Sequence, residues 1–446
     1  MIWIQFLIVL AMILIGARMK SIGLGVMGML GLLIFIVVFH MRPTDPPLDV
    51  MLIIMAIVTT GAALQAAGGL DYLVSVAEKI IRKNPSQITF LAPLTTYFLC
   101  LFAGTSHIVY SLLPIISEVA AKKRIRPERP LSISVIASHV ALTGSPMSAA
   151  TAAFAAILAY PGAAVDIMKI GIPSCIIGLM AGAFSVRKMG KELSEDPEFI
   201  EKMKDPAFAQ SIDKETSGTK REIKPGAKTA VLIFGIAILL VVLCGAFPQL
   251  VPNVGAGNAS FSVNANGSLT MGTIIEVITL SASALIMLIT KTQAVDVVKA
   301  SLFTSMASAV ISVFGVVWMS ATFMSNNDAI IRSALGNITQ NYPWTFTFAL
   351  FIMGALIFSQ AATTRTMMPL GMVLGIANPH LIAMFPAVNA DFTLPGYPTL
   401  LAAINFDRTG STKIGKYVVN HSFMRPGLVT ITVAIAVGFL LSSIFL

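Results

Sequence analysis

The chain has 446 residues, of which 56% are hydrophobic and 11% are charged, and its mean hydropathy is +0.84. This profile excludes an ordinary globular core and indicates an all-α protein that crosses a membrane several times. The net charge of +9 does not indicate a nucleic-acid partner. The Lys and Arg residues cluster in short loops between apolar segments, where they orient membrane spans.

Apolar segments of about 20 residues recur along the chain, as a bilayer core of about 30 Å requires. The first is read as a membrane span and not as a signal peptide, because its positive charges follow the apolar run. We expect ten spans, at residues 2–17, 21–40, 47–67, 131–160, 164–186, 229–248, 271–290, 299–325, 379–406 and 424–446.

Two further apolar segments, 86–121 and 344–376, are interrupted by small polar residues. Their centres read "AGTSH" at 103–107 and "SQAATT" at 359–364. Non-helical backbone at membrane depth is tolerated where it is buried in protein or lines a cavity. Both segments are therefore predicted to be re-entrant hairpins, which enter the membrane and return to the same side.

Positive charges predict the orientation of the spans. With the N-terminus outside, Arg18, Lys20 and the clusters at 79–83 and 122–129 fall on the inner side. The polar segment 187–228 then forms a cytoplasmic loop, whereas the outer loop 249–270 contains no Lys or Arg. The charge rule thus supports ten spans with both termini outside.

The two halves of the chain repeat one pattern. Asp71, Pro114 and Pro146 match Asp328, Pro369 and Pro398 at offsets of 252 to 257 residues. Each half would hold three spans, an amphipathic helix at the membrane surface, a hairpin, a broken span and a closing span. Five crossings is an odd number, so residues 229–446 would be inverted relative to 1–186, an arrangement typical of transporters. The first amphipathic helix would use Leu70, Leu73, Val74, Ala77, Ile80 and Ile81 as its apolar face.

Both broken spans carry a Gly-x-Pro sequence, "GSP" at 144–146 and "GYP" at 396–398. Ser145 is a favoured N-cap, and Pro146 suits the first position of a new helix because its missing N–H would be unpaired there anyway. Pro398 and Thr399 would restart the second broken helix in the same way. The pairs Thr105–Ser106 and Thr363–Thr364 would cap the second arms of the hairpins.

Four half-helix starts would then meet near the centre of the membrane, each with free N–H groups and a positive dipole end that favour an anion. One helix terminus contributes about 0.3–1 kcal/mol, and up to about 2 kcal/mol when partly buried. Several termini and hydroxyls are therefore needed for a dianion, which predicts a small, hydroxyl-rich site for carboxylates. The candidate residues are Gly104, Thr105, Ser106, His107, Gly144, Ser145, Pro146, Ser148, Gln360, Thr363, Thr364, Gly396, Tyr397, Pro398 and Thr399.

Each feature has a simpler interpretation. Hydroxyls in membrane helices can bond their own backbone, His107 and His139 can be packed core residues, and Arg365 can face the static part of the protein. Asp71 and Asp328 would orient their amphipathic helices. No residue spacing suggests a metal site, and no paired carboxylates suggest a proton relay, although sodium on the carbonyls near Gly104 and Gly144 stays open.

Two other functional classes are consistent with parts of the sequence. An intramembrane serine hydrolase would use Ser106 or Ser145 with His107 or His139, but adjacent Ser and His residues point to different faces of a helix. A sodium- or proton-coupled symporter for a small anion is the closer alternative. The chain contains no ATP-binding loop motif, so we expect a secondary transporter and not an enzyme.

Five stretches together resemble the Dcu family of anaerobic bacterial C4-dicarboxylate transporters: "GARMKSIGLGVMGMLG", "AAGGLDYLVSVAEKIIRKNP", "FAGTSHIVYSLLPIISEVA", "SQAATTRTMMPL" and "LPGYPTLLAAINFDRTGSTKIGKYVVNHSFMRPG". The resemblance implies inward transport of fumarate, malate or aspartate in exchange for succinate across the bacterial inner membrane, with both termini periplasmic. It also implies the homodimeric, elevator-like fold of the ion transporter superfamily and no cofactor.

The stretches point to two branches of that family. "HIVYSLLPII" and "FDRTGSTKIGKYVVNHSF" resemble the fumarate–succinate antiporter branch, DcuB, which implies a sensor-kinase partner. "SQAATTRTMMP", with Arg365, and "PGYPTL", with Leu400 in place of an acid, resemble the aspartate-preferring branch, DcuA. The preferred acid is therefore left open between the two.

Overall fold

The structure is a computed structural model that describes residues 2–446 except 20–21, 47, 159, 161, 214–222, 256–261, 265, 304–309, 312–313, 316–317, 324, 328–329, 331–341, 358, 395 and 416–419. Within the described residues every regular element is a helix, and β-structure is limited to isolated bridges. The all-α class predicted from the sequence is therefore confirmed.

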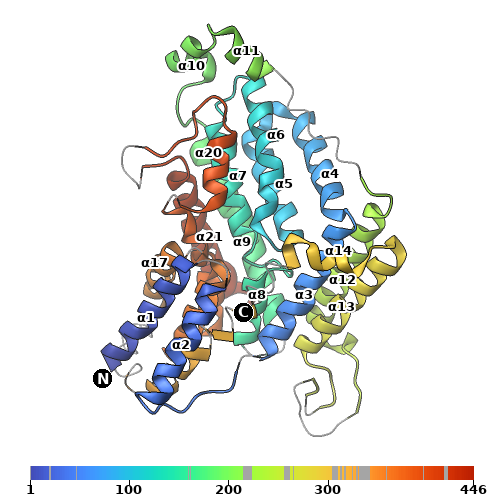
Figure 1. The fold of residues 1–446 in the computed structure, drawn as a ribbon, viewed down its shortest axis with the longest axis vertical. Helices are drawn as coiled ribbons and strands as arrows, with labels where there is room; N and C mark the ends of the chain where they lie inside the picture. Colours follow the sequence, from blue (N-terminus) through green and yellow to red (C-terminus); the bar gives the residue numbers. More distant parts are fainter. Residues whose placement is uncertain are drawn as a thin grey trace.

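The first three helices coincide with the first three expected spans. α1 (Ile2–Met19) packs against α2 (Gly23–Val37), and α3 (Leu48–Ala66) follows. α3 packs along α13 (Met271–Thr290), which also contacts α12 (Ala227–Ala246). Since α12 and α13 belong to the second half of the chain, both halves contribute to this part of the molecule (Figure 1).

α4 (Gly69–Lys83) is the amphipathic helix expected after the third span, and it bends by 70° from α3. Its buried residues include Leu70, Val74 and Ile81, which lie on one helical face and pack with the helices that follow. Ile80, expected on the same face, is 40% exposed. The corresponding segment of the second half, with Asp328, lies largely outside the described residues.

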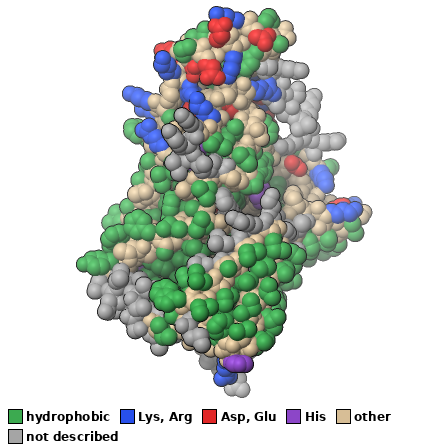
Figure 2. All heavy atoms as spheres, turned by 60° about the vertical axis from the view of Figure 1, so that its left-hand side comes forward, with side chains coloured by type: hydrophobic (Ala, Val, Ile, Leu, Met, Phe, Trp, Pro, Cys, Tyr) green, Lys and Arg blue, Asp and Glu red, His purple; other side chains and the backbone are tan. Residues whose placement is uncertain are grey.

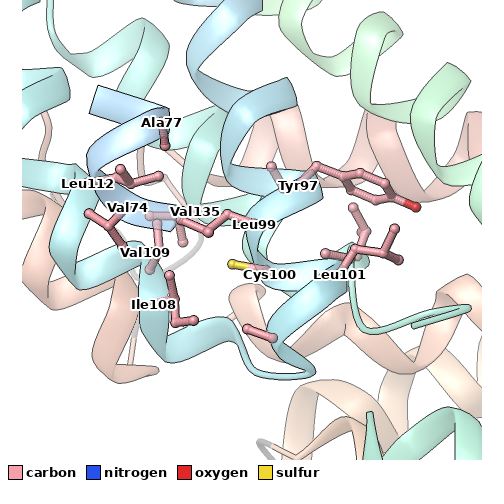
Figure 3. Close-up of a cluster of buried hydrophobic side chains, with 14 of the residues drawn as sticks. Val74, Ala77, Tyr97, Leu99, Cys100, Leu101, Ile108, Val109, Leu112 and Val135 are labelled. Atoms are coloured by element: carbon pink, nitrogen blue, oxygen red, sulfur yellow. The ribbon is translucent and has the colours of Figure 1, made fainter. Parts of the chain in front are cut away.

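The first expected hairpin consists of α5 (Ile88–Ala103), the short η2 (Ser106–Ile108) and α6 (Val109–Lys122). A short turn of helix, η1 (Pro85–Gln87), precedes it. The arms α5 and α6 lie side by side (Figure 1). Figure 3 shows why they pack: Val74, Ala77, Leu99, Cys100, Val109, Leu112 and Val135, from α4, both arms and the next helix, form one buried apolar cluster.

The first broken span consists of α7 (Glu128–Val140), a non-helical segment at 141–148, and α8 (Ala149–Leu158). The break is thus where the sequence predicts it. The expected restart at Pro146 with Ser145 as N-cap is wrong, because α8 begins at Ala149. α9 (Ala163–Val186) is the closing span of this half.

The expected cytoplasmic loop begins with three short helices, η3 (Leu193–Glu195), α10 (Pro197–Lys202) and α11 (Pro206–Asp213). Leu193, Phe199 and Ile212 form a small apolar cluster with Ala121 near the end of α6. This cluster holds the segment at the upper end of the molecule, opposite the N-terminus (Figure 1).

The second half begins with α12 and α13 and continues with a further set of helices. α14 (Ala294–Lys299) follows α13, and part of the expected span 299–325 lies outside the described residues. The second hairpin comprises η6 (Pro343–Thr345), α17 (Phe346–Ile357) and α18 (Gln360–Val373). α18 begins at Gln360 with Ser359 as its N-cap. Thr363 and Thr364 therefore lie inside the helix, and the expectation that they cap it is wrong.

The second broken span comprises α19 (Asn378–Met384), η7 (Phe385–Phe392) and α20 (Pro398–Phe406). Here the restart falls on the residue that the sequence predicts, with Pro398 at the first helical position. α21 (Met424–Phe445) closes the half and packs along α9. The division of the chain into two inverted repeats stays a prediction.

Several helices are suited to a membrane. In the described residues, five are long and apolar enough to cross one by length and composition: Pro85–Ala103, Ala163–Val186, Ala227–Gly245, Met271–Thr290 and Met424–Phe445. A sixth is added if the bent pair α3–α4 is one span. Figure 2 shows hydrophobic side chains over the middle of the molecule, and most Lys, Arg, Asp and Glu at the end that carries α10 and α11. The protein is therefore a multi-pass membrane protein, whereas the count of ten spans stays a prediction.

Candidate functional site

The tip of the first hairpin packs directly on the first break. Gly104 ends α5 with φ of 69°, in the left-handed region that favours glycine. A Cβ at this position would collide with the carbonyl group of Met147. The Thr105 hydroxyl accepts a hydrogen bond from the His107 N–H at 3.3 Å, so Thr105 caps the second arm as predicted.

The first break satisfies its own polar groups. Gly144 turns the chain with φ of 89°. Ser148, not Ser145, is the N-cap of α8, since its Oγ accepts from the Thr151 N–H at 3.0 Å. The Ser148 hydroxyl also donates to the Leu142 carbonyl at 2.7 Å. Ser145 Oγ donates to the Leu101 carbonyl of the hairpin at 2.6 Å. These hydroxyls therefore hold the break together, as the simpler interpretation has it.

The second hairpin presents a different set of groups. Thr364 donates to the carbonyl of Gln360 within its own helix at 2.7 Å. Thr363 is fully buried, and its hydroxyl has no hydrogen-bond partner among the described residues, which leaves it available to a ligand. Arg365, next in the helix, is 2% exposed, so it does not reach out to the membrane surface.

Six buried side chains meet between the broken elements, and we call them the central polar cluster. They are Ser106, His139, Gln360, Asp391, Tyr397 and Thr399. They come from η2, α7, α18, η7 and the start of α20. The hydroxyl of Tyr397 hydrogen bonds with the side chains of Ser106 and Gln360. Both hairpins and both broken spans thus contribute to one polar centre.

Asp391 is the electrostatic centre of the cluster. Its Oδ2 accepts from the Gln360 amide at 2.6 Å. Its Oδ1 lies 2.9 Å from His139 Nδ1, with the side chains 0% and 1% exposed. This contact is an ion-pair approach and not a well-aligned hydrogen bond, since neither atom meets hydrogen-bond geometry. On the other side of the ring, His139 Nε2 lies 2.7 Å from the Thr399 hydroxyl.

An accessible rim borders the cluster. His107, Gly396 and Pro398 are exposed, and Gly104 and Thr105 are half-buried. The His107 ring stacks on Tyr110 with centroids 5.9 Å apart.

A second connection joins the two breaks. The Asn389 amide of η7 donates to the Thr143 hydroxyl at 2.6 Å and to the Pro386 carbonyl at 2.9 Å. A cavity of about 720 Å³ reaches the same region, with Pro146 and Thr151 on its lining. The rest of its lining comes mainly from α3, α9, α12, α13 and the loop before α13. It therefore lies between the first break and the helices that pack with α3.

The sequence identified part of this centre. Of the fifteen candidate residues, Ser106, Gln360, Tyr397 and Thr399 lie in the central polar cluster, whereas Gly144, Ser145, Pro146 and Ser148 lie at the first break. His139, which the sequence suggests is a packed and hydrogen-bonded residue, has that role. Asp391 was not predicted, because the sequence contains no second carboxylate beside it to suggest a proton relay. A single acid within an apolar segment is itself a signal of function, and this criterion would have found it.

The geometry does not favour a metal cluster or a serine hydrolase in the described residues. The described residues contain no group of His, Cys, Asp and Glu that would hold a metal ion. For a hydrolase, a Ser hydroxyl must bond to a His ring. In the structure Ser145 donates to the Leu101 carbonyl, and the partner of His139 Nε2 is Thr399.

Helices that break in pairs and meet in a buried polar centre, within an apolar helical protein, define a class of membrane transporter. The whole chain, residues 1–446, matches the family described as "Anaerobic c4-dicarboxylate membrane transporter". The protein therefore belongs to the DcuA/DcuB family, which is a family of transporters and not of enzymes.

Individual relatives support this assignment. The chain is 40% identical over 443 residues to the C4-dicarboxylate transporter DcuA of Wolinella succinogenes, covering 99% of both chains. It is 37% identical over 449 residues to DcuA of Escherichia coli K12, covering 100% of both. It is 36% identical over 450 residues to the anaerobic C4-dicarboxylate transporter DcuB of Escherichia coli O6:H1, covering 99% of this chain and 98% of the relative. The solved YdaH transporter of Alcanivorax borkumensis aligns with 99% of this chain and 96% of its own at 16% identity, with a TM-score of 0.49.

Proposed function

We propose that this protein exchanges C4-dicarboxylates across the bacterial inner membrane, with fumarate, malate or aspartate moving inward and succinate moving outward. The observation that carries the proposal is the central polar cluster. It gathers hydroxyl, amide and imidazole groups from both hairpins and both breaks in a buried position. Family membership supplies the class of substrate.

The donor groups of the cluster suit a carboxylate, whereas the like charge of Asp391 opposes one unless a positive charge balances it. The start of α20 places the positive end of its helix dipole beside Thr399, and the Thr105 cap places the start of η2 nearby. A dianion stripped of water needs several such donors, because each helix terminus contributes only about 0.3–1 kcal/mol. Donors that come from four separate elements can close around a ligand and separate again when it leaves.

Exchange follows from the cost of an empty site. Donors without a carboxylate partner are costly to bury, so a site loaded with one dicarboxylate should cross more readily than an empty one. In the proposed elevator mechanism, the two hairpins and the two broken spans carry the ligand past α3, α12 and α13. A homodimer, a membrane orientation with both termini periplasmic, and a sensor-kinase partner of the DcuB kind belong to the same proposal.

Proteoliposomes test the proposal. The purified protein should take up labelled succinate into vesicles preloaded with fumarate, malate or aspartate, in sodium-free buffer. Uptake should be at background in empty vesicles. The internal acid that supports the fastest uptake identifies the preferred substrate. Absence of succinate uptake under every condition would overturn the proposal.

Proton-coupled symport is the second candidate, and the buried pair of His139 and Asp391 favours it, because a buried ionisable pair can carry a proton. Uptake into empty vesicles that depends on an inward proton gradient would select this function. A sodium requirement for uptake would instead indicate a cation site at the breaks.

A further inference from the structure

His139 has two different partners on its two ring nitrogens. Asp391 Oδ1 lies 2.9 Å from Nδ1, and the Thr399 hydroxyl lies 2.7 Å from Nε2. The ring is fully buried in α7, and the Tyr397 ring contacts it edge-on with centroids 4.7 Å apart. His139 thus links the only carboxylate of the central polar cluster to the threonine at the start of α20.

The protonation state of the ring decides what Thr399 can do. When both nitrogens carry a proton, Nε2 donates to Thr399 Oγ1, and the hydroxyl proton of Thr399 is free to point at a ligand. When only Nδ1 is protonated, Nε2 needs a donor and takes the hydroxyl proton of Thr399. Thr399 then presents lone pairs, which repel a carboxylate.

Asp391 is the charged neighbour of the ring. A buried carboxylate is costly unless an opposite charge balances it. Gln360 gives Oδ2 a hydrogen bond but no charge. The His139 ring is the group in contact with Oδ1 that can carry a balancing charge.

Other ionisable groups on the surrounding elements contribute to this environment. His107 of η2 interacts electrostatically with His139 and opposes a second positive charge. α6 carries Glu118, which is paired with Arg82 and Lys122. Other ionisable groups on elements packed against α7 or η7 are Tyr97 and Cys100 of α5, Tyr110 of α6, Asp166, Lys169 and Cys175 of α9, Arg365 of α18, His380 of α19, Tyr397 and Arg425 of α21. α7 itself also carries Glu128 and Arg129. His139 makes its ion-pair contact with Asp391.

We propose that His139 is a proton switch for the dicarboxylate site: its second proton turns Thr399 into a hydrogen-bond donor and thereby sets the affinity for the ligand. His139 acts through Thr399 and is a positioning residue. The inference rests on the proposed dicarboxylate function and adds to it a residue-level cause of pH dependence.

The test is equilibrium binding of labelled fumarate to the purified protein between about pH 6 and about pH 8, the range in which histidines titrate. Fumarate is chosen because both of its carboxyl groups are ionised throughout this range. The wild-type affinity should be highest at low pH and fall by up to about tenfold per pH unit above a midpoint, the limit for one linked proton. An affinity that is independent of pH overturns the inference, while the proposed function stands. No fumarate binding at any pH overturns both.

Three variants assign the effect to the switch. Thr399→Val should bind about 10- to 100-fold more weakly at low pH and lose the pH dependence, as expected for a lost bond to a charged group. Thr399→Ser, which keeps a hydroxyl, should show the wild-type affinity and the wild-type pH dependence. Asp391→Asn should change the midpoint, since the carboxylate in contact with the ring is gone. A Thr399→Val profile that keeps the wild-type pH dependence contradicts the switch.

Control variants distinguish protonation of His139 from misfolding and from protonation of His107. Thr96→Val in α5 removes a buried hydroxyl that donates to its own helix at 2.8 Å, and Ser138→Ala does the same beside His139 at 2.7 Å. Both should keep the wild-type midpoint. His107→Gln should also keep the midpoint, whatever its affinity. If the midpoint disappears in His107→Gln and persists in Asp391→Asn, the proton is on His107 and the inference is wrong.

Discussion

The two breaks carry the same Gly-x-Pro sequence but use their polar groups in opposite ways. At the first break, Ser148 and Thr151 both bond to the Leu142 carbonyl and to the backbone of the break itself. At the second break, Tyr397 and Thr399 bond to side chains of other elements. The comparison indicates that hydroxyls of the first break bond mainly to backbone carbonyls, whereas those of the second break bond to side chains; in the proposed function, the second break supplies the groups that select a ligand.

Asp391→Leu tests the second break at its electrostatic centre and should have the largest effect. It leaves the His139 ring without its counter-charge and the Gln360 amide without its acceptor. The free energy of unfolding should fall by about 3–5 kcal/mol, as for other buried pairs that lose one partner. Thermal unfolding in detergent measures it. His139→Leu combined with Asp391→Leu should recover part of the loss, and no recovery would contradict a coupled pair.

Glycine replacements test how closely the tip of the first hairpin packs on the first break. Gly104→Ala faces both the left-handed backbone and the Met147 carbonyl, and should cost about 2 kcal/mol or more. Gly144→Ala meets only the side chain and amide of Ile172, at 3.1 and 3.3 Å, and should cost less. Gly162→Ala is the matched control, since φ is +92° but nothing lies within 4 Å. Equal melting temperatures for Gly104→Ala and Gly162→Ala would contradict the close packing of tip and break.

Ser148→Ala should destabilise the protein by about 0.5–2 kcal/mol, because it removes the N-cap of α8. Its affinity for dicarboxylate should stay within about twofold of wild type, since the hydroxyl is used within the break. Thermal unfolding and binding at one pH measure the two quantities. A large loss of affinity with little loss of stability would place Ser148 in the ligand site and break the contrast between the two breaks.

The smallest effect is expected away from both breaks, at the Arg126–Asp196 pair, where Nη1 and Oδ2 lie 2.6 Å apart. Burial of Asp196 raises the pKa of its carboxyl, but the hydrogen bond and charge of Arg126, with backbone hydrogen bonds, lower it by more. The pKa of this carboxyl is therefore below its ordinary value. The pair therefore stabilises the fold above the usual carboxyl range, and this contribution is lost as the pH falls through the lowered pKa, below about pH 4. Asp196→Asn should cost less than about 1 kcal/mol at neutral pH, measured by thermal unfolding. A larger loss would show that the segment 187–213 is held mainly by this pair.

The sequence predicted helix positions well because membrane helices are long and apolar, and composition alone marks them. The helix restart at Pro398 was also predictable, since proline suits the first position of a helix. The restart after Pro146 was not, because Ser148 caps α8 by accepting from the Thr151 N–H, whereas Ser145 accepts from the Met147 N–H and donates to the Leu101 carbonyl of the hairpin. Thr363 and Thr364 were misplaced for a similar reason, as Ser359 starts α18 one turn earlier.

Several contacts of the site join residues that are far apart in the chain, and local sequence does not predict such contacts. His139 and Thr399 are 260 residues apart, and Gln360 meets Asp391 from a separate element. Local sequence shows that each group is polar and near a break. It does not show that one carboxylate joins an imidazole and an amide, which is what distinguishes the second break from the first.

Exchange in proteoliposomes by two matched variants tests the central claim most directly. Thr399→Val changes the second break, and Thr96→Val removes a buried threonine hydroxyl outside both breaks. The account predicts that labelled succinate exchange for internal fumarate falls at least about tenfold in Thr399→Val at equal amounts of folded protein, and is unchanged in Thr96→Val. A succinate exchange rate in Thr399→Val equal to that of the wild-type protein would contradict the claim that the second break binds the dicarboxylate.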